Sequence, residues 1–117
     1  MNLESWMFPV VALAIVMLLP RLLGGGRAKP DVVKAMIANG AQIVDVRSPE
    51  EFRGGAFKGA RNIPLPNLGQ RLGELQKDKP LVVYCASGMR SAAAAGQLKK
   101  AGFSNVANAG GLAQMPR

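Results

Sequence analysis

The sequence predicts an α/β fold in which a central parallel sheet of about four to five short strands has helices on both faces, preceded by one transmembrane helix. In residues 30–117, short runs rich in β-branched residues alternate with segments whose apolar side chains recur at helical spacing. This alternation favours a parallel sheet, because neighbouring parallel strands are joined by helical crossovers. An uncharged apolar stretch precedes these residues.

The N-terminal segment, residues 1–23, is expected to be a membrane anchor. Residues 5–23 form an apolar run, interrupted only by Arg21, of about 19 residues, or about 28 Å of helix, close to the thickness of a hydrocarbon core. The acidic Glu4 precedes the run, whereas the basic residues Arg21, Arg27 and Lys29 end or follow it. The positive-inside rule therefore predicts a single-pass membrane protein with its folded domain in the cytoplasm. A cleaved signal peptide and a buried hairpin segment are the alternatives, although a signal peptide should begin with basic residues.

Residues 24–29 open with three glycines and predict a flexible linker, after which residues 30–117 form the folded domain. The domain begins with a short helix, in which Val33, Met36 and Ile37 share one face. Gly40 is well placed to end this helix.

The next two elements follow directly. Residues 42–46 (QIVDV) are β-branched and mostly apolar, which predicts a buried strand. A helix should begin after Ser48, because Ser48 can cap it, Pro49 suits its first position and Glu51 completes a capping box.

The remaining elements continue the alternation. Residues 61–64 are expected to form a short strand and residues 68–75 a one-sided helix. Residues 80–85 (PLVVYC) are the clearest strand of the chain. An alanine-rich helix over residues 91–101 should follow, and residues 104–109 should form the last strand.

The composition and charge of the chain exclude several classes of partner and of site. The net charge of +8 indicates an anionic partner, but the basic residues are scattered and not interleaved with aromatic ones, which argues against nucleic acid. The chain has a single cysteine, Cys85, and no histidine. An intramolecular disulfide, a Cys-His nucleophile pair and a Cys-His zinc site are therefore excluded, and we expect no metal and no cofactor.

The residues after the strand at 80–85 suit a reactive thiol. Cys85 leaves the carboxyl end of the strand, where α/β folds place ligands, and Gly88 lets the loop turn so that its amides converge on the sulfur. Ser91 should begin and cap the next helix, and Arg90 adds a permanent charge. Such surroundings should lower the thiol pKa and bind an oxyanion, although a lone cysteine after an apolar strand is often inert packing.

Three motifs, CASGMRS, DVRSPEEF and GARNIPL, resemble those of the rhodanese family in amino-acid sequence and in their order along the chain. The resemblance covers most of residues 31–111. The resemblance implies a compact α/β domain in which Cys85 takes up sulfane sulfur as a persulfide and passes it to an acceptor. It implies that Asp45 and Arg47 form a scaffold for the active loop, and the alternative is a surface ion pair at a strand end. The residues expected to bind the substrate are Ala86, Ser87, Gly88, Met89, Arg90 and Ser91.

Within this resemblance, four residues separate Cys85 from Arg90, whereas related phosphatases and arsenate reductases have five, so the tighter loop favours sulfur. The chain departs from the family in two places. GAFKGA (residues 55–60) lacks a histidine found in many members, and the C-terminus lacks the tryptophan and final helix that often follow, which predicts thin cover of the sheet edge.

The leading hypothesis is a sulfurtransferase that moves sulfur from thiosulfate or a persulfide donor to cyanide, a thiol or a protein thiol. Its membrane contact should come from residues 5–23 and it should not bind nucleic acid. The alternatives are a membrane-tethered binding module without catalysis and a relay that receives sulfur from a partner protein.

Overall fold

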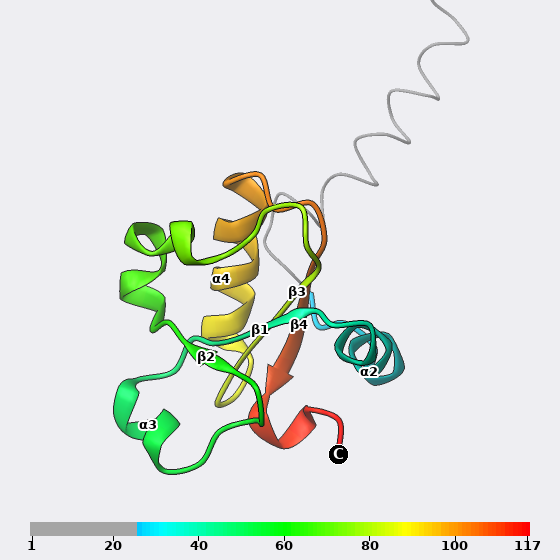
Figure 1. The fold of residues 1–117 in the computed structure, drawn as a ribbon. Helices are drawn as coiled ribbons and strands as arrows, with labels where there is room; N and C mark the ends of the chain where they lie inside the picture. The colour runs from blue at the N-terminus through cyan, green and yellow to red at the C-terminus, as the bar shows by residue number, and fades with distance from the viewer. Residues whose placement is uncertain (1–25) are drawn as a thin grey trace, which may run out of the picture.

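The structure is a computed structural model that describes residues 26–117 (Figure 1). The predicted anchor, residues 1–23, and the first part of the predicted linker lie outside the described residues. Within residues 26–117, none of the helices has the length and apolar character needed to cross a bilayer.

The core of the domain is a four-stranded sheet in the order β2-β1-β3-β4, and every neighbouring pair of strands is parallel. The strands are β1 (Gln42–Asp45), β2 (Arg61–Asn62), β3 (Leu81–Cys85) and β4 (Val106–Gly111). All five residues of β3 are buried, as its apolar sequence predicts. The predicted parallel sheet is confirmed.

Helices cover both faces of this sheet (Figure 1), which confirms the predicted layers. Helix α2 (Pro30–Ala38) packs on one face and helix α4 (Met89–Lys100) on the other. Side chains alternate along β3, so that Val82 and Tyr84 face the α2 side, while Val83 and Cys85 face the α4 side. Cys85 therefore lies between the sheet and α4.

The predicted starts of the first two helices and the predicted end of the first are confirmed. In α2, Val33 is buried, and the chain turns at Gly40, whose φ of +86° favours glycine. Helix α3 (Pro49–Arg53) begins with a complete capping box, because the Ser48 hydroxyl accepts from the Glu51 amide and the Glu51 carboxylate accepts from the Ser48 amide.

Two helix predictions need correction. The helix expected over residues 68–75 is replaced by two 3₁₀ turns, η1 (Leu65–Gln70) and η2 (Leu72–Glu74), because Pro66, Gly69 and Gly73 are poor residues for an α-helix. The helix expected from Ser91 begins at Met89, since Gly88 is its N-cap with φ +105°. Ser91 is thus inside the first turn of α4 and does not cap it.

Both ends of the described chain pack against β4. Of the predicted linker, Arg27 forms a parallel bridge with Asn108 and the Ala28 amide donates to the Asn108 carbonyl at 2.7 Å, so this part is paired with the sheet. After β4, the turn η3 (Leu112–Gln114) is followed by the buried Met115. These contacts cover an edge that was expected to be thinly covered.

Candidate active site

Cys85 ends the interior strand β3 at the carboxyl edge of the sheet, the position at which α/β folds bind ligands. The residue has no exposed surface. Two polar groups nevertheless reach its sulfur: the Gly88 amide donates to Sγ at 2.9 Å, and Sγ is hydrogen-bonded to the Ser91 Oγ at 3.4 Å. The sulfur therefore lies at the polar end of an otherwise apolar core.

These contacts change the acidity of the thiol. Burial raises the pKa of Cys85 because it penalises the charged thiolate, but the hydrogen bonds of the loop oppose this effect. The Ser91 hydroxyl and the amides of Ser91, Gly88 and Ser87 stabilise the thiolate, and the net result is a pKa below the ordinary 9.0. Cys85 is thus more readily ionised than an unperturbed cysteine, which is a property of a nucleophilic thiol.

The loop from Ala86 to Arg90 owes its shape to two glycines. Gly88 has φ +105°, a conformation that side-chain-bearing residues rarely adopt, and this turns its amide toward Sγ. Gly111, at the end of β4, lies against the Ala86 carbonyl so closely that a Cβ there would collide with it. A residue without a Cβ, that is glycine, is therefore required at position 111 for the loop to pack on β4.

Ser91 connects the loop to the sheet. Its hydroxyl accepts from the neutral Cys85 thiol at 3.4 Å and donates its one proton to the Gly88 carbonyl at 3.1 Å, with the Gly110 carbonyl 3.4 Å away. Toward the thiolate, the same proton is donated to the sulfur instead. The capping role predicted for this hydroxyl is wrong, because the helix already begins at Met89. The hydroxyl is instead buried beside Cys85.

Arg90 is held by a carboxylate from helix α3. Its guanidinium donates to the two carboxylate oxygens of Glu51 at 2.7 and 3.0 Å, and this contact, with those from Ser48, lowers the pKa of Glu51 to about 2. Arg90 also interacts electrostatically with Cys85. The sequence indicates only the capping role of Glu51, because its contact with Arg90 joins residues 39 positions apart. The guanidinium of Arg90 is therefore paired with Glu51, and it acts on the sulfur only through space.

Asp45 and Arg47 form a second ion pair, which is buried. The Arg47 guanidinium donates to Asp45 Oδ2 at 2.7 Å and to the Gly55 carbonyl at 2.8 Å, and the two side chains are 7% and 0% exposed. The guanidinium also lies 5.7 Å from the ring centre of Tyr84, the residue before Cys85. This geometry does not fit a surface ion pair, and it links the ends of β1 and β3 to the segment after α3.

That segment, which lacks the histidine found in many rhodaneses, is attached to β3 by a backbone hydrogen bond. The Phe57 amide in GAFKGA donates to the Tyr84 hydroxyl at 2.9 Å, and Phe57 packs against the α2 side of the core. Burial raises the pKa of Tyr84 to about 12, so the phenol is neutral near pH 7. A backbone amide thus anchors the segment to β3.

The structure brings together some of the predicted substrate-binding residues and not others. Ser87, Gly88 and Ser91 interact with the sulfur. The Ala86 carbonyl instead faces Gly111, and the Met89 side chain is 82% exposed. The part of the chain from Gly26 onward holds no group of His, Cys, Asp and Glu side chains suited to a metal ion.

This arrangement suits a thiolate that attacks an anionic reagent. The amides and the hydroxyl that stabilise the thiolate also suit the negative charge of an adduct on the sulfur. The sulfur itself is buried, and its polar contacts come from the loop and from the first turn of α4.

Comparisons with known proteins identify a family and relatives for this chain. The sequence profile of the rhodanese-like domain family matches residues 29–114. The chain is 50% identical over 68 residues to the uncharacterized protein YqhL of Bacillus subtilis, covering 58% of this chain and 54% of YqhL, so it spans about half the length of that relative. It is 38% identical over 80 residues to thiosulfate sulfurtransferase GlpE of Pseudomonas aeruginosa, covering 68% of this chain and 73% of GlpE.

One solved structure extends the comparison to three dimensions. The fold is similar to that of a rhodanese with anions from E. coli, with a TM-score of 0.61 and 36% sequence identity. The alignment covers 65% of this chain and 94% of that chain. The family match includes the strand, loop and helix around Cys85.

Proposed function

The chain belongs to the family of rhodanese-like domains, and we propose that it is a sulfurtransferase that carries sulfane sulfur as a persulfide on Cys85. The observation that carries the proposal is the pair of polar contacts to the sulfur, from the Gly88 amide and the Ser91 hydroxyl, which favour the thiolate. Its similarity to thiosulfate sulfurtransferase GlpE supports the same reaction class.

In the first half of the reaction, the Cys85 thiolate attacks the outer sulfur of thiosulfate or of a persulfide donor. A sulfur–sulfur bond forms on Sγ, while the bond that joins the outer sulfur to the rest of the donor breaks. Its electron pair leaves with sulfite when the donor is thiosulfate, and with the donor's thiolate when the donor is a persulfide. The loop amides stabilise the negative charge on the new outer sulfur. The Cys85 thiolate and the sulfur donor are both anions. Arg90, which lies beside the loop, offsets part of the repulsion between them.

In the second half, cyanide or a thiol removes the outer sulfur and leaves the Cys85 thiolate. The chain contains no second cysteine, so this acceptor comes from outside. Glu51 positions Arg90 beside the loop, and the buried pair of Asp45 and Arg47 keeps the ends of β1 and β3 in place. In this proposal neither carboxylate contacts the reacting sulfur.

Intact-mass spectrometry of the full chain tests the proposal. After incubation with thiosulfate and desalting, the protein should gain about 32 Da, the mass of one sulfur, and should lose it when cyanide is added. In Cys85→Ser the gain and the release of thiocyanate should fall to background, because a serine hydroxyl does not ionise near pH 7. A wild-type protein that gains no mass, or a Cys85→Ser variant with normal turnover, would favour a binding module without catalysis.

We also propose that residues 5–23 anchor the chain in a membrane with the rhodanese-like domain on the cytoplasmic side. The apolar run, whose one charged residue is Arg21 near its end, and the basic residues after it support this placement. Carbonate extraction of cells that express the full chain should leave it in the membrane pellet, and protease added outside intact cells should not cut the domain. Recovery of the chain in the carbonate supernatant would contradict the anchor.

A further inference from the structure

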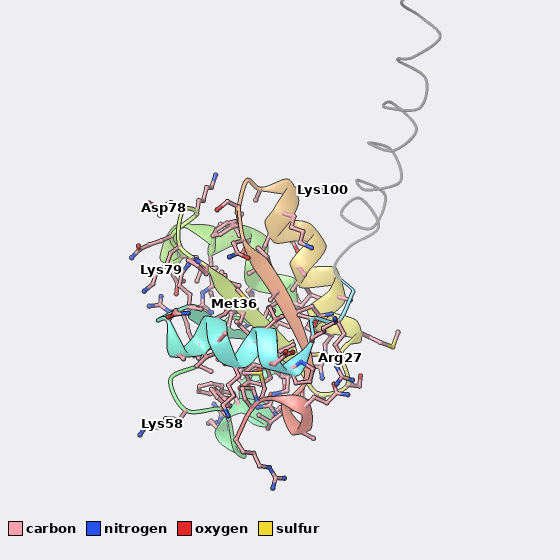
Figure 2. The ribbon with its side chains drawn as sticks, turned by 90° about the vertical axis from the view of Figure 1, so that its right-hand side faces the viewer. Arg27, Met36, Lys58, Asp78, Lys79 and Lys100 are labelled. Carbon is pink, nitrogen blue, oxygen red and sulfur yellow. The ribbon has the colours of Figure 1, made fainter. Side chains whose placement is uncertain are left out.

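A cleft of about 340 Å³ lies beside the active loop, between the N-terminal arm (residues 26–29), the start of α4 and the end of β4. Its lining includes Arg27, Ser87, Gly88, Met89, Asn108 and Gln114. Figure 2 shows Arg27 near the end of β4 and the first turn of α4. The volume is at the lower end of the range of about 300–1,000 Å³ for small-molecule sites, so the cleft suits a small ligand.

The backbone fixes Arg27 at this cleft. Arg27 is bridged to Asn108 on β4, so its position does not depend on its side chain. Its aliphatic stem lies over Gly110, where an added Cβ would be 3.2 Å from Arg27 Cδ. A Cβ on Gly88 would in turn lie 3.5 Å from Gly110 Cα, and the Gly88 amide contacts the sulfur. One glycine therefore separates the Arg27 stem from the active loop.

The charge of the cleft is positive. Among residues 26–117, the salt bridges do not include Arg27, and the groups that line the cleft with it are not acidic. The side chains of Ser87, Asn108 and Gln114 add neutral polar groups, and Met89 adds an exposed apolar one. An arginine in such neutral surroundings is suited to a carboxylate, which it can bind through two parallel hydrogen bonds.

We propose that this cleft binds the carboxylate of a small acceptor thiol and thereby guides that thiol to the Cys85 persulfide. The inference rests on the proposed function, because it assigns the acceptor half of the reaction to residues outside the active loop. The only cysteine of the chain carries the sulfur, so a thiol from outside must remove it, and the cleft adjoins the loop that covers the sulfur. Arg27 acts here as a specificity-determining residue.

The transfer balances without an oxidant or a reductant. The Cys85 persulfide anion first takes up a proton from water. The acceptor thiolate then attacks the outer sulfur of the protonated persulfide, and a new sulfur–sulfur bond forms as the bond to Sγ breaks. The electron pair of the broken bond stays on Sγ as a thiolate, which the Gly88 amide and the Ser91 hydroxyl stabilise. The proton leaves on the acceptor persulfide.

Single-turnover discharge of the preloaded full chain tests this assignment. Glutathione, which carries two carboxylates, is compared with 2-mercaptoethanol, which carries none, in the wild type, in Arg27→Ala and in Arg27→Lys. In Arg27→Ala we expect the second-order rate with glutathione to fall by about five- to tenfold, as the loss of a charge-assisted contact predicts, with little change for 2-mercaptoethanol. Arg27→Lys should retain part of the glutathione rate. Lys100→Ala, an exposed cation at the opposite end of α4 (Figure 2), is the matched control and should behave as the wild type.

An equal fall with both thiols, or no fall with either, would overturn the proposal. A parallel fall in the rate of persulfide loading by thiosulfate would assign Arg27 to the donor and overturn it too. Binding of unreactive S-methylglutathione, followed by amide NMR shifts at Ser87 and Gly110, separates the site from the chemistry. If shifts appear in the wild type and vanish in Arg27→Ala while no persulfide ever forms, the cleft is confirmed and the proposed function fails, whereas absence of shifts in the wild type overturns the cleft.

Discussion

Two arginine–carboxylate pairs flank the active loop, and they differ in burial. The Asp45–Arg47 pair is almost fully buried, with side chains 0% and 7% exposed, and it joins residues two positions apart. The Glu51–Arg90 pair has side chains 34% and 38% exposed, and it joins helix α3 to the loop across 39 positions. The first pair links the ends of β1 and β3 to the segment after α3, and the second pair holds the loop itself.

This difference teaches that similar chemical groups serve different purposes at one site. A buried charge left without its partner is costly, so the Asp45–Arg47 pair should control whether the fold forms. An exposed pair adds little stability, so the Glu51–Arg90 pair should matter mainly through the position of Arg90. The comparison therefore separates stability from activity, and each of the following variants can break it or sharpen it.

Arg47→Met should have the largest effect on stability. It removes the bonds to Asp45 and to the Gly55 carbonyl and leaves the carboxylate buried without its cation. We expect the free energy of unfolding to fall by about 3–5 kcal/mol, measured by urea denaturation. Arg71→Met, which breaks the half-exposed pair with Glu74, is the matched control and should cost no more than about 1 kcal/mol. Similar losses in both variants would show that burial does not distinguish the pairs.

The sheet and the capping box were largely accessible from the sequence, whereas the burial of the Asp45–Arg47 pair was not, because a surface ion pair stayed open as an alternative. The strands at 42–46 and 80–85 carry apolar, β-branched runs, and the capping box of Ser48 and Glu51 is a local pattern, so short-range chemistry was enough to place them. The helix predicted at 68–75 failed because its leucine spacing also fits a pair of 3₁₀ turns, in which Leu68 and Leu75 are still buried.

The details of the loop were less accessible. The place of Cys85 and Gly88 after a strand was enough to predict that the loop turns the Gly88 amide toward the sulfur of Cys85. The contacts of Glu51 with Arg90 and of Arg27 with Asn108 could not be predicted, since each joins residues far apart in the chain. The role of Ser91 was misjudged because a start of α4 only two residues earlier turns its hydroxyl from the helix end to the sulfur.

Glu51→Gln should have an intermediate effect, mainly on turnover. The glutamine oxygen can still accept from the Ser48 amide, so the cap survives, but Arg90 loses its ionic partner. We expect kcat/KM for thiosulfate to fall by about tenfold as the loop loses its fixed geometry, whereas the free energy of unfolding should change little. Glu74→Gln, in a pair remote from the loop, should keep the wild-type rate. A large loss of stability with unchanged kcat/KM would reverse the roles of the two pairs.

The low pKa of Glu51 defines the pH range in which this prediction can be tested. Because Arg90 lowers its pKa to about 2, the stabilisation from this carboxylate is fully present above its ordinary pKa of 4.5 and is lost only as the pH falls through about 2. The pair therefore stays intact between pH 5 and 7. Any change in the reactivity of Cys85 over that range then reports on the thiol and not on Glu51.

Ser91→Ala should have the smallest effect, and it isolates the thiol from both ion pairs. The hydroxyl opposes the effect of burial on Cys85, so its loss should raise the pKa of the thiol. The rate of Cys85 alkylation by iodoacetamide should therefore reach its half-maximum at a higher pH than in the wild type, and the rate at pH 7 should fall by about two- to fivefold. Ser104→Ala, which removes an exposed hydroxyl far from the loop, should leave the profile unchanged. A midpoint that moves down, or does not move, would mean that the loop amides alone set the ionisation of Cys85.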